Sequence, residues 1–243
     1  MTRVTTLRKL RILKTIPVQP TEGHFVNNRE MIEAFKDPNT EVVYRGLTNC
    51  DVKAVSDEQT RRSVASLHVK MVLDAQTEGF DAVAMGCLLE PGVEEAKRKC
   101  KIPIVGALEA SLHMASMLGS RFSIIMGGSD IVRGDFKNGT DNILVKLIDN
   151  YGMISRVASI RGIGLQVLDF FPEYKNLGKL KELMLRESRR AIESDNANVI
   201  IMYGGITVLR YLQERLPVPV LNQKQAQIMM AEALARSQLP RNN

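Results

Sequence analysis

Two short glycine-containing motifs each follow an apolar run, and one of them carries a cysteine. Gly86-Cys87 follows the run DAVAM, and Gly204-Gly205 follows the run NVIIMY. A buried cysteine is usually an inert, small hydrophobic side chain, whereas a thiol at the end of a strand can be reactive when its surroundings stabilise the thiolate. The position of Cys87 alone leaves both interpretations open.

The other cysteines and the histidines form no recognisable metal or disulfide pattern. Cys50 and Cys100 have no CxxC partner, and three cysteines are an odd number, so we expect neither a disulfide scaffold nor a structural zinc site. Both are expected to be structural or surface thiols. The histidines lack HExxH-type spacing, so the sequence predicts no bound metal. They are His24, His68 and His113.

Polar and flexible residues also lie near other expected strand ends. Glu109 and His113 are four residues apart, so they share one face of an expected helix. Glu109 lies nearer the strand end and is expected to face a ligand, whereas His113 is expected to be structural. The pairs Gly127-Gly128 and Gly204-Gly205 are either simple turns or places where the backbone approaches a ligand. Their placement in equivalent halves favours the second interpretation.

The composition is that of a soluble globular protein. Of the 243 residues, 44% are hydrophobic and 25% are charged, and no apolar run approaches the roughly 20 residues that span a bilayer. The basic N-terminus lacks a small-residue cleavage pattern, so we expect no signal peptide and a cytoplasmic location. The net charge is +6, but the basic residues are spread out and there is no tryptophan, so we expect no nucleic-acid partner.

Short apolar segments alternate with longer amphipathic ones along the chain. Such alternation predicts βαβ units, and therefore parallel sheets covered by helices on both faces. The expected strands are residues 10–13, 41–47, 81–86, 102–106, 122–127, 154–160, 198–203 and 218–222. The expected helices include residues 57–78, 92–99, 107–118, 177–195 and 224–236.

The second half of the chain repeats the pattern of the first. IPIVGALEASLHMA begins at Ile102 and VPVLNQKQAQIMMA begins at Val218, so matching residues lie 116 positions apart. We therefore expect an α/β fold with two similar Rossmann- or flavodoxin-like lobes, residues 1–106 and 107–221, related by a pseudo-twofold duplication. The C-terminal helix, residues 222–243, is expected to return to the first lobe.

The duplication also predicts where a ligand binds. In open parallel sheets, ligands bind beyond the carboxyl ends of the strands. Gly86-Cys87 and Gly204-Gly205 both occupy such ends. If the lobes face each other, the two motifs meet across a cleft, and we expect the active site there.

A long segment around Cys87 matches a known pattern. GCLLEPGVEEAKRKCKIPIVGALEASLHMASMLGSRFSII resembles the hydantoin and allantoin racemase branch of the aspartate/glutamate racemase superfamily. That branch has Gly-Cys, then Asp-Pro-Gly, a Pro-Val-Val-Gly strand, a Glu-Ala-x-x-His helix start and a Phe-Ser strand. The counterparts here are Gly86-Cys87, Glu90-Pro91-Gly92, Ile102–Gly106, Glu109–His113 and Phe122-Ser123. The resemblance covers roughly residues 80 to 235.

The resemblance implies cofactor-independent proton transfer at a carbon next to a carbonyl. In the family, two cysteines lie on opposite faces of the substrate, one removing a proton and the other returning it. A thiolate at a strand end, near loop amides or a helix N-terminus, has a lowered pKa, and we expect this of Cys87. The enolate that forms needs hydrogen-bond donors, which glycine-rich loops supply through their amides.

The chain departs from the family at the second cysteine. There it reads Tyr203-Gly204-Gly205-Ile206-Thr207, so either Gly204 or Gly205 stands in place of the second thiol. Two-thiol racemisation is therefore not the only mechanism to consider. Arylmalonate decarboxylase-like members of the superfamily use one cysteine opposite a glycine, with the cysteine in the second half of the chain. This chain would be the mirror arrangement.

The leading hypothesis is a cofactor-independent racemase or isomerase for a small hydantoin- or amino-acid-like substrate. Cys87 is the catalytic acid/base, opposed by a substrate group, water or Thr207. A single-cysteine decarboxylase or lyase and a catalytically silent binding protein stay open as alternatives. The expected partners are the substrate and further copies of the chain in a dimer, tetramer or hexamer, and no membrane. The expected substrate contacts are Gly86, Leu88, Glu109, Gly127, Gly128, Gly204, Gly205, Ile206, Thr207 and Pro17.

Overall fold

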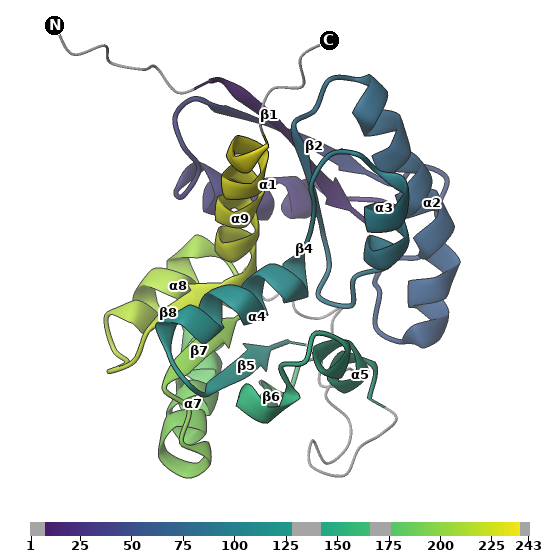
Figure 1. The fold of residues 1–243 in the computed structure, drawn as a ribbon. Coiled ribbons are helices and arrows are strands. Elements are labelled where there is room, and N and C mark those ends of the chain that lie inside the picture. The colour runs from purple at the N-terminus through teal and green to yellow at the C-terminus, as the bar shows by residue number, and fades with distance from the viewer. Residues whose placement is uncertain (1–7, 128–141, 166–175, 239–243) are drawn as a thin grey trace, which may run out of the picture.

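Two four-stranded parallel sheets form the framework of the protein. The computed structural model describes residues 8–127, 142–165 and 176–238 (Figure 1). The first sheet has the order β2-β1-β3-β4, with β1 Leu10–Ile16, β2 Thr40–Gly46, β3 Ala82–Met85 and β4 Ile104–Gly106. The second has the order β6-β5-β7-β8, with β5 Phe122–Met126, β6 Val157–Gly162, β7 Val199–Met202 and β8 Val220–Asn222. The matching strand orders confirm the predicted two-lobed α/β fold.

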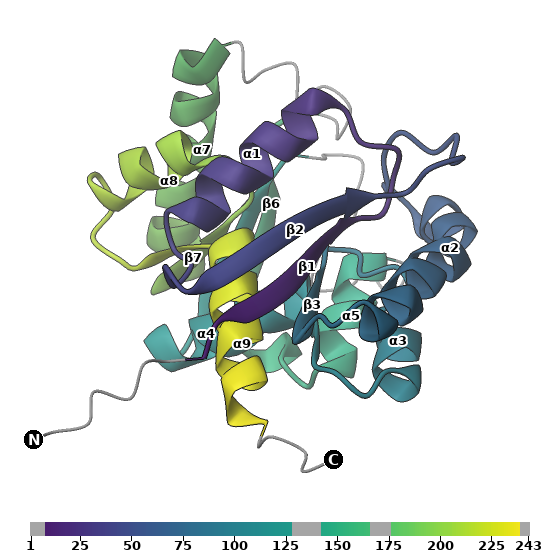
Figure 2. The same ribbon diagram turned by 90° about the horizontal axis from the view of Figure 1, so that it is seen from above.

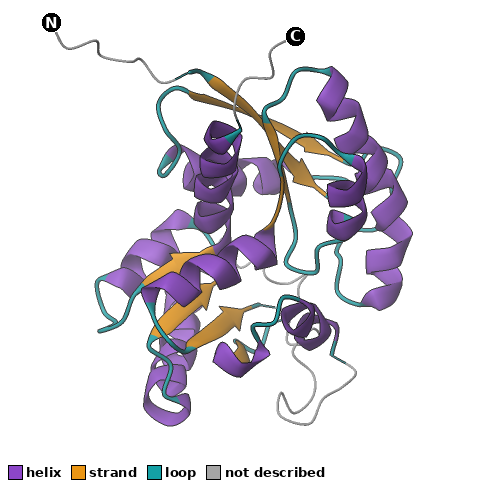
Figure 3. Cartoon of the chain, in the orientation of Figure 1, coloured by secondary structure: helices purple, strands orange, loops and turns teal. Residues whose placement is uncertain are grey.

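Helices cover the faces of both sheets (Figure 3). The inner strands β3 and β7 are buried along their whole length, as their unbroken apolar runs AVAM and VIIM require. The helices are α1 Glu22–Glu33, α2 Glu58–Thr77, α3 Val93–Lys99, α4 Ala107–Leu118, α5 Ile143–Asn150, α7 Leu177–Asp195, α8 Ile206–Gln213 and α9 Gln223–Ser237. Among the described residues, none of these helices combines the length and the apolar character that crossing a bilayer requires.

One predicted strand begins later than expected. Residues 154–156 form a 3-10 turn, Ile154–Arg156, and β6 starts at Val157. Of the helices in the described part of the chain, three were not predicted: α1, α5 and α8. In particular, Ile206 and Thr207 belong to the first turn of α8 rather than to a loop.

The repeat seen in the sequence is also a repeat of strand register. β4 pairs with β3 as β8 pairs with β7, so Val83 lies beside Ile104 and Ile200 lies beside Val220. β4 and β8 are 116 residues apart, which is the offset of the two matching sequence segments. β3 and β7 are 117 residues apart, because the connection from β7 to β8 is one residue shorter than the connection from β3 to β4.

This register decides which glycine corresponds to Cys87. Met85 and Met202 occupy equivalent final positions of β3 and β7. Counting onward, Gly86 corresponds to Tyr203 and Cys87 corresponds to Gly204. The sequence leaves both glycines open and puts Gly205 first, with Gly204 as the alternative if the gap falls one residue earlier; the strand register favours Gly204.

The last helix of each repeat reaches across to the other sheet. Figures 1 and 2 show α9 beside β1, although β8, which precedes it, belongs to the second sheet. Gln227 of α9 donates to the carbonyl oxygens of Met85 (2.6 Å) and Val105 (2.8 Å), at the ends of β3 and β4. α4 packs in turn against α9 and β7. The domain boundaries at 106 and 221 stay predictions, but these contacts bring both lobes to one place.

Candidate active site

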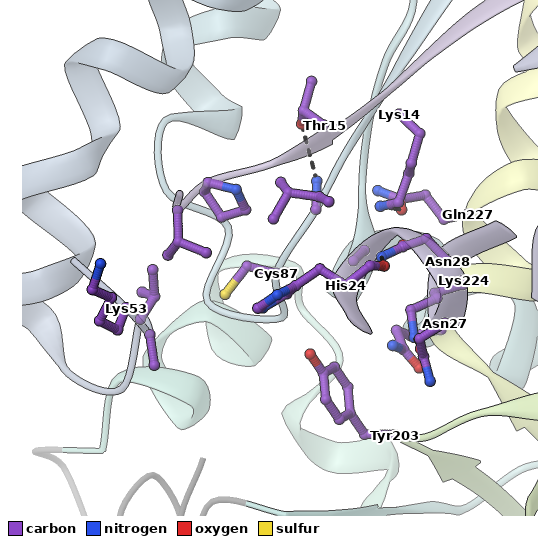
Figure 4. A pocket seen from close by; sticks show the side chains of 18 residues that line it. Lys14, Thr15, His24, Asn27, Asn28, Lys53, Cys87, Tyr203, Lys224 and Gln227 are labelled. Atoms are coloured by element: carbon purple, nitrogen blue, oxygen red, sulfur yellow. Dashed lines mark hydrogen bonds between the residues drawn. The ribbon is translucent and has the colours of Figure 1, made fainter. Parts of the chain in front are cut away.

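A pocket opens where the carboxyl ends of β1, β3 and β7 meet the N-terminus of α9 (Figure 4). It holds about 710 Å³ of atom-free space, part of it open to solvent, which suits a small molecule. Residues from both lobes line it, including Cys87 and Tyr203. The full lining is Lys14, Thr15, Ile16, Pro17, Val18, His24, Asn27, Asn28, Lys53, Ala54, Val55, Gly86, Cys87, Ala107, Tyr203, Gln223, Lys224 and Gln227.

Cys87 is the one cysteine of the three that lines this pocket. Its φ is +77°, a left-handed conformation that a side chain other than glycine adopts at a cost. This turn lets the backbone amide of Leu89 donate to the Cys87 Sγ at 3.4 Å. Cys50 is buried elsewhere in the core, and Cys100 ends α3.

The protonation state of Cys87 differs from the prediction. Desolvation by burial raises the pKa of Cys87 to about 11 and outweighs the amides of Leu89 and Glu90 and the ammonium of Lys14, which lower it. The expected lowered pKa is therefore wrong in this structure. The loop amides are present, but they do not compensate for the loss of water around a thiolate. Cys87 is held as a thiol, which is a proton donor.

A chain of buried hydrogen bonds fixes the loop that carries Cys87. His68 donates from Nδ1 to the carbonyl oxygen of Pro91 at 2.8 Å, and desolvation lowers the pKa of His68 to about 4, so the ring is neutral. The Thr15 hydroxyl therefore donates to His68 Nε2 at 2.6 Å. Thr15 Oγ1 in turn accepts from the amide of Gly86 at 3.2 Å. β1 and α2 thus hold both ends of the loop from Gly86 to Pro91.

Glu90 connects the same loop to the second lobe through hydrogen bonds. Its carboxylate accepts from the backbone amide of Glu109 at 3.0 Å, in the first turn of α4, and from the hydroxyl of Tyr151 at 2.5 Å. Gly106 leaves the space for this carboxylate, because a Cβ there would lie 2.1 Å from Glu90 Oε1. Desolvation raises the pKa of Glu90 to about 7. Glu90 therefore caps α4 and joins the cysteine loop to Tyr151.

Two buried lysines give the pocket a positive wall. Lys14 of β1 donates to Gln227 Oε1 at 2.5 Å, and Lys224 in the first turn of α9 donates to Asn27 Oδ1. Their side chains are almost fully buried, and their described partners are neutral amides. Desolvation lowers the pKa of each to about 7, and for Lys14 the neighbouring Lys224 lowers it further. Lys14 and a thiolate at Cys87 favour each other's charged forms.

Tyr203 faces Cys87 from the second lobe. Its ring rises from the end of β7 with the hydroxyl directed toward the loop that carries Cys87 (Figure 4). Desolvation raises the pKa of Tyr203, and the charge of a Cys87 thiolate raises it further. The ammonium of Lys224 lies 5.6 Å from the centre of the ring. A phenol therefore occupies the place that the sequence analysis assigned to a substrate group, water or Thr207.

The predicted contact residues divide into two groups. Pro17 and Gly86 line the pocket with Cys87. The others that the structure describes do not. Four of these are buried away from it: Leu88, Gly127, Gly204 and Gly205. At the start of α8, Ile206 is half-buried and Thr207 is exposed. Glu109 forms an ion pair with Lys97. Gly128 lies outside the described residues.

Sequence reasoning missed the residues that α1 and α9 bring to the pocket. Asn27 and Asn28 are buried on α1, and Gln223, Lys224 and Gln227 are buried on α9. Polar residues at helical spacing on a buried face were a usable signal, as was a lone lysine within the apolar strand LRILKTI. The described residues contain no cluster of histidine, cysteine or acidic side chains that could hold a metal ion.

Comparisons with known proteins agree with this architecture. The sequence model of the Asp/Glu/hydantoin racemase family matches residues 27–231. A hydantoin racemase of Pseudomonas sp. (strain NS671) is 32% identical over 168 residues, which are 68% of this chain and 63% of that protein. A hydantoin racemase of Paenarthrobacter aurescens is 31% identical over 186 residues, covering 74% of this chain and 73% of the relative. The matched region thus spans under two thirds of the Pseudomonas protein's length.

Solved structures share the fold. An allantoin racemase from Klebsiella pneumoniae superposes with a TM-score of 0.80 at 23% identity, covering 93% of this chain and 87% of that one. A liganded mutant of arylmalonate decarboxylase, with one glycine changed to cysteine and one cysteine changed to serine, gives a TM-score of 0.67 at 16% identity, covering 95% and 94%. From the match over residues 27–231 and the two hydantoin racemase relatives, this chain belongs to the Asp/Glu/hydantoin racemase family.

Proposed function

We propose that this protein is a cofactor-independent racemase or isomerase that moves a proton at a carbon next to a carbonyl group. Cys87 is its acid/base group. The observation that carries the proposal is the strained left-handed turn that holds the Cys87 thiol in the pocket between the lobes. Such strain persists only where the surrounding structure enforces it, as the bonds from Thr15, His68 and Glu90 do here.

The chemistry requires a base on one face of the carbon and an acid on the other. The base is the thiolate form of Cys87, which is the minor form in the free pocket because burial raises the pKa of the thiol, and the charge of Lys14 favours that form. The electron pair of the broken C–H bond moves onto the carbonyl oxygen as an enolate, which the positive wall of the pocket stabilises. The Tyr203 hydroxyl is the proton donor that faces Cys87, so protonation from that side inverts the carbon.

Hydrogen exchange at the reacting carbon tests this proposal. Each enantiomer of a 5-substituted hydantoin is incubated with the enzyme in deuterated buffer and followed by proton NMR. Exchange with inversion is expected for the wild type, and Cys87→Ser should lose it by several orders of magnitude. Cys100→Ser is the matched control, because that thiol lies outside the pocket. Unchanged turnover in Cys87→Ser would rule the mechanism out.

One observation favours a second function, decarboxylation or another lyase reaction. The pocket has a single thiol, held in the protonated form, and a glycine stands at the equivalent position of the other lobe. A thiol that only donates can protonate an enediolate from one face after carbon dioxide is lost. Release of carbon dioxide from an α-substituted malonate, with incorporation of a single deuterium, distinguishes this reaction from racemisation.

The broader expectations from the sequence belong to the same proposal. The cytoplasmic location and the homo-oligomeric assembly both stay predictions from the sequence. A silent binding protein would bind ligands in the pocket without any exchange in the NMR experiment.

A further inference from the structure

The two buried lysines lack an acidic partner among the residues described. Lys14 and Lys224 each donate to a neutral amide, from Gln227 and Asn27 respectively. None of the residues that line the pocket is aspartate or glutamate. A buried ammonium without a counter-charge destabilises the folded protein. Proteins retain such groups mainly where an opposite charge lies beside them. Within residues 8–127, 142–165 and 176–238 no side chain supplies that charge to the pocket, so a bound anion is the group that fits there.

The N-terminus of α9 adds to this positive potential. Lys224 lies in its first turn, and Asn222 caps the helix by accepting from the amide of Lys224 at 2.8 Å. Helix N-termini carry a partial positive charge and attract anions. The equivalent end of α4 is already occupied by the carboxylate of Glu90. The end of α9 instead faces the pocket through Gln223, Lys224 and Gln227.

A third group at the same place has no partner in the part of the chain that the structure describes. Gln223 is 3% exposed and lines the pocket, and its side-chain oxygen has no hydrogen-bond partner among the described residues. Buried amide oxygens are nearly always satisfied, so this one points to a ligand that carries an N–H donor. Two cations and one acceptor therefore sit together on the wall that α9 and β1 form.

From this arrangement we infer that the substrate is a small carboxylate that also carries an N–H group, and that Lys14 and Lys224 bind its carboxylate. The inference rests on the proposed function in taking the ligand to be the molecule on which Cys87 acts. It narrows that function, because a neutral hydantoin ring would leave both ammonium groups without a counter-charge. The exposed Lys53 at the edge of the pocket adds to the field that draws an anion in.

A competing use of the lysines is to stabilise only the enolate of a neutral substrate. The two uses predict different affinities for the substrate before any proton is transferred. A lysine pair that binds a carboxylate discriminates in the bound ground state, whereas a pair that serves the enolate contributes only in the transition state. Equilibrium binding therefore separates them.

The experiment compares two probes that differ in one group. 5-Carboxymethylhydantoin and 5-carbamoylmethylhydantoin share the ring, the N–H groups and the acidic C–H, but only the first is an anion. Calorimetric titration of the wild type is expected to give at least about tenfold tighter binding of the carboxylate, as lost hydrogen bonds to charged groups imply. Lys14→Met and Lys224→Met should each reduce this preference, and Lys70→Met, on the exposed face of α2, should not.

Equal affinity for the two probes, or no binding of the carboxylate at millimolar concentration, overturns the inference. So does an unchanged preference in both pocket variants. The proposed function is judged separately by deuterium exchange on the same probes. Tight carboxylate binding without exchange would refute the racemase and leave the anion site intact. Exchange without a carboxylate preference would refute the anion site and leave the racemase intact.

Discussion

The hydroxyl of Tyr151 donates a 2.5 Å hydrogen bond to Glu90 Oε2, and so joins the second lobe to the loop that carries Cys87. The contact changes the pKa of both groups. The carboxylate raises the pKa of Tyr151, whose burial is the larger cause, and the hydroxyl partly offsets the desolvation that raises the pKa of Glu90 to about 7. A buried acid whose pKa lies near neutrality makes the stability of this junction depend on pH.

We expect Glu90→Gln to flatten the pH dependence of stability. Because the folded pKa of about 7 lies above the ordinary glutamate value of 4.5, the native state binds more protons than the unfolded state between these values. The stabilising contribution is therefore complete below pH 4.5 and lost as the pH rises through 7. Thermal melts should show a smaller decrease from pH 5 to 8 in the variant, by on the order of 3 kcal/mol.

Tyr151→Phe provides the opposite change at the same junction. Removing the donor raises the pKa of Glu90 further, so the loss of stability should begin at the same pH and extend to higher pH. Glu193→Gln, on the exposed surface of α7, is the control and should melt like the wild type at every pH. Parallel pH profiles for the wild type and Glu90→Gln would show that Glu90 does not titrate in this range.

Thr15→Val should destabilise the protein through hydrogen bonds alone. The two side chains have nearly the same shape, but valine leaves the Gly86 amide and His68 Nε2 buried without partners. Each unsatisfied group costs about 1–3 kcal/mol, so denaturant titration should give a loss of roughly 2–5 kcal/mol. Thr77→Val, near the exposed end of α2, is the matched control and should cost far less. Equal losses in the two variants would contradict the hydrogen-bond chain.

The two pocket lysines should have opposite effects on the reactivity of Cys87. Lys14→Met removes the cation that lowers the pKa of Cys87, so alkylation by iodoacetamide at pH 8 should slow severalfold. Lys224→Met removes a neighbour that lowers the pKa of Lys14, so Lys14 carries more charge and alkylation should become faster. The rate measured against pH gives the thiol pKa in each variant. Changes of the same sign would show that the effect is one of access rather than of charge.

Much of the fold could be predicted because it follows from local patterns. β3 and β7 have unbroken apolar runs, and the limits of the helices at 57–78 and 177–195 were close to the observed ones. Helix α1 escaped prediction because its buried face carries Asn27 and Asn28 beside Met31 and Ile32, so it lacks a clear apolar period.

Only the part of the site that directly follows a predicted strand could be predicted from the sequence. Cys87 and Gly86 follow a strand end, a position that sequence can identify. Lys14 and Lys224 are 210 residues apart and meet only because α9 crosses to the first sheet. The pKa of Cys87 could not be anticipated either, because it depends on how far the folded chain desolvates the thiol.

The last prediction concerns Gly204, the structural equivalent of Cys87. Gly204 does not have a positive φ, unlike the described glycines at 79, 92, 152 and 164, so its backbone accepts a side chain without left-handed strain. The Asn222 side chain donates to the Gly204 carbonyl oxygen at 3.0 Å, which fixes the turn whatever side chain it carries. Gly204→Cys is expected to raise the rate of exchange with inversion, because a second thiol then supplements the phenol of Tyr203.

Gly205→Cys is the matched control for this variant. Gly205 has an extended backbone, with φ of −89°, but it caps α8 and lies one residue beyond the position equivalent to Cys87. Deuterium exchange from each enantiomer should increase in Gly204→Cys and stay at the wild-type rate in Gly205→Cys. Because the donor on the second face changes from a phenol to a thiol, the upper limb of the pH–rate profile should also move to lower pH in Gly204→Cys alone. An increase in Gly205→Cys instead would mean that the register of β7 does not set the position of the second catalytic group.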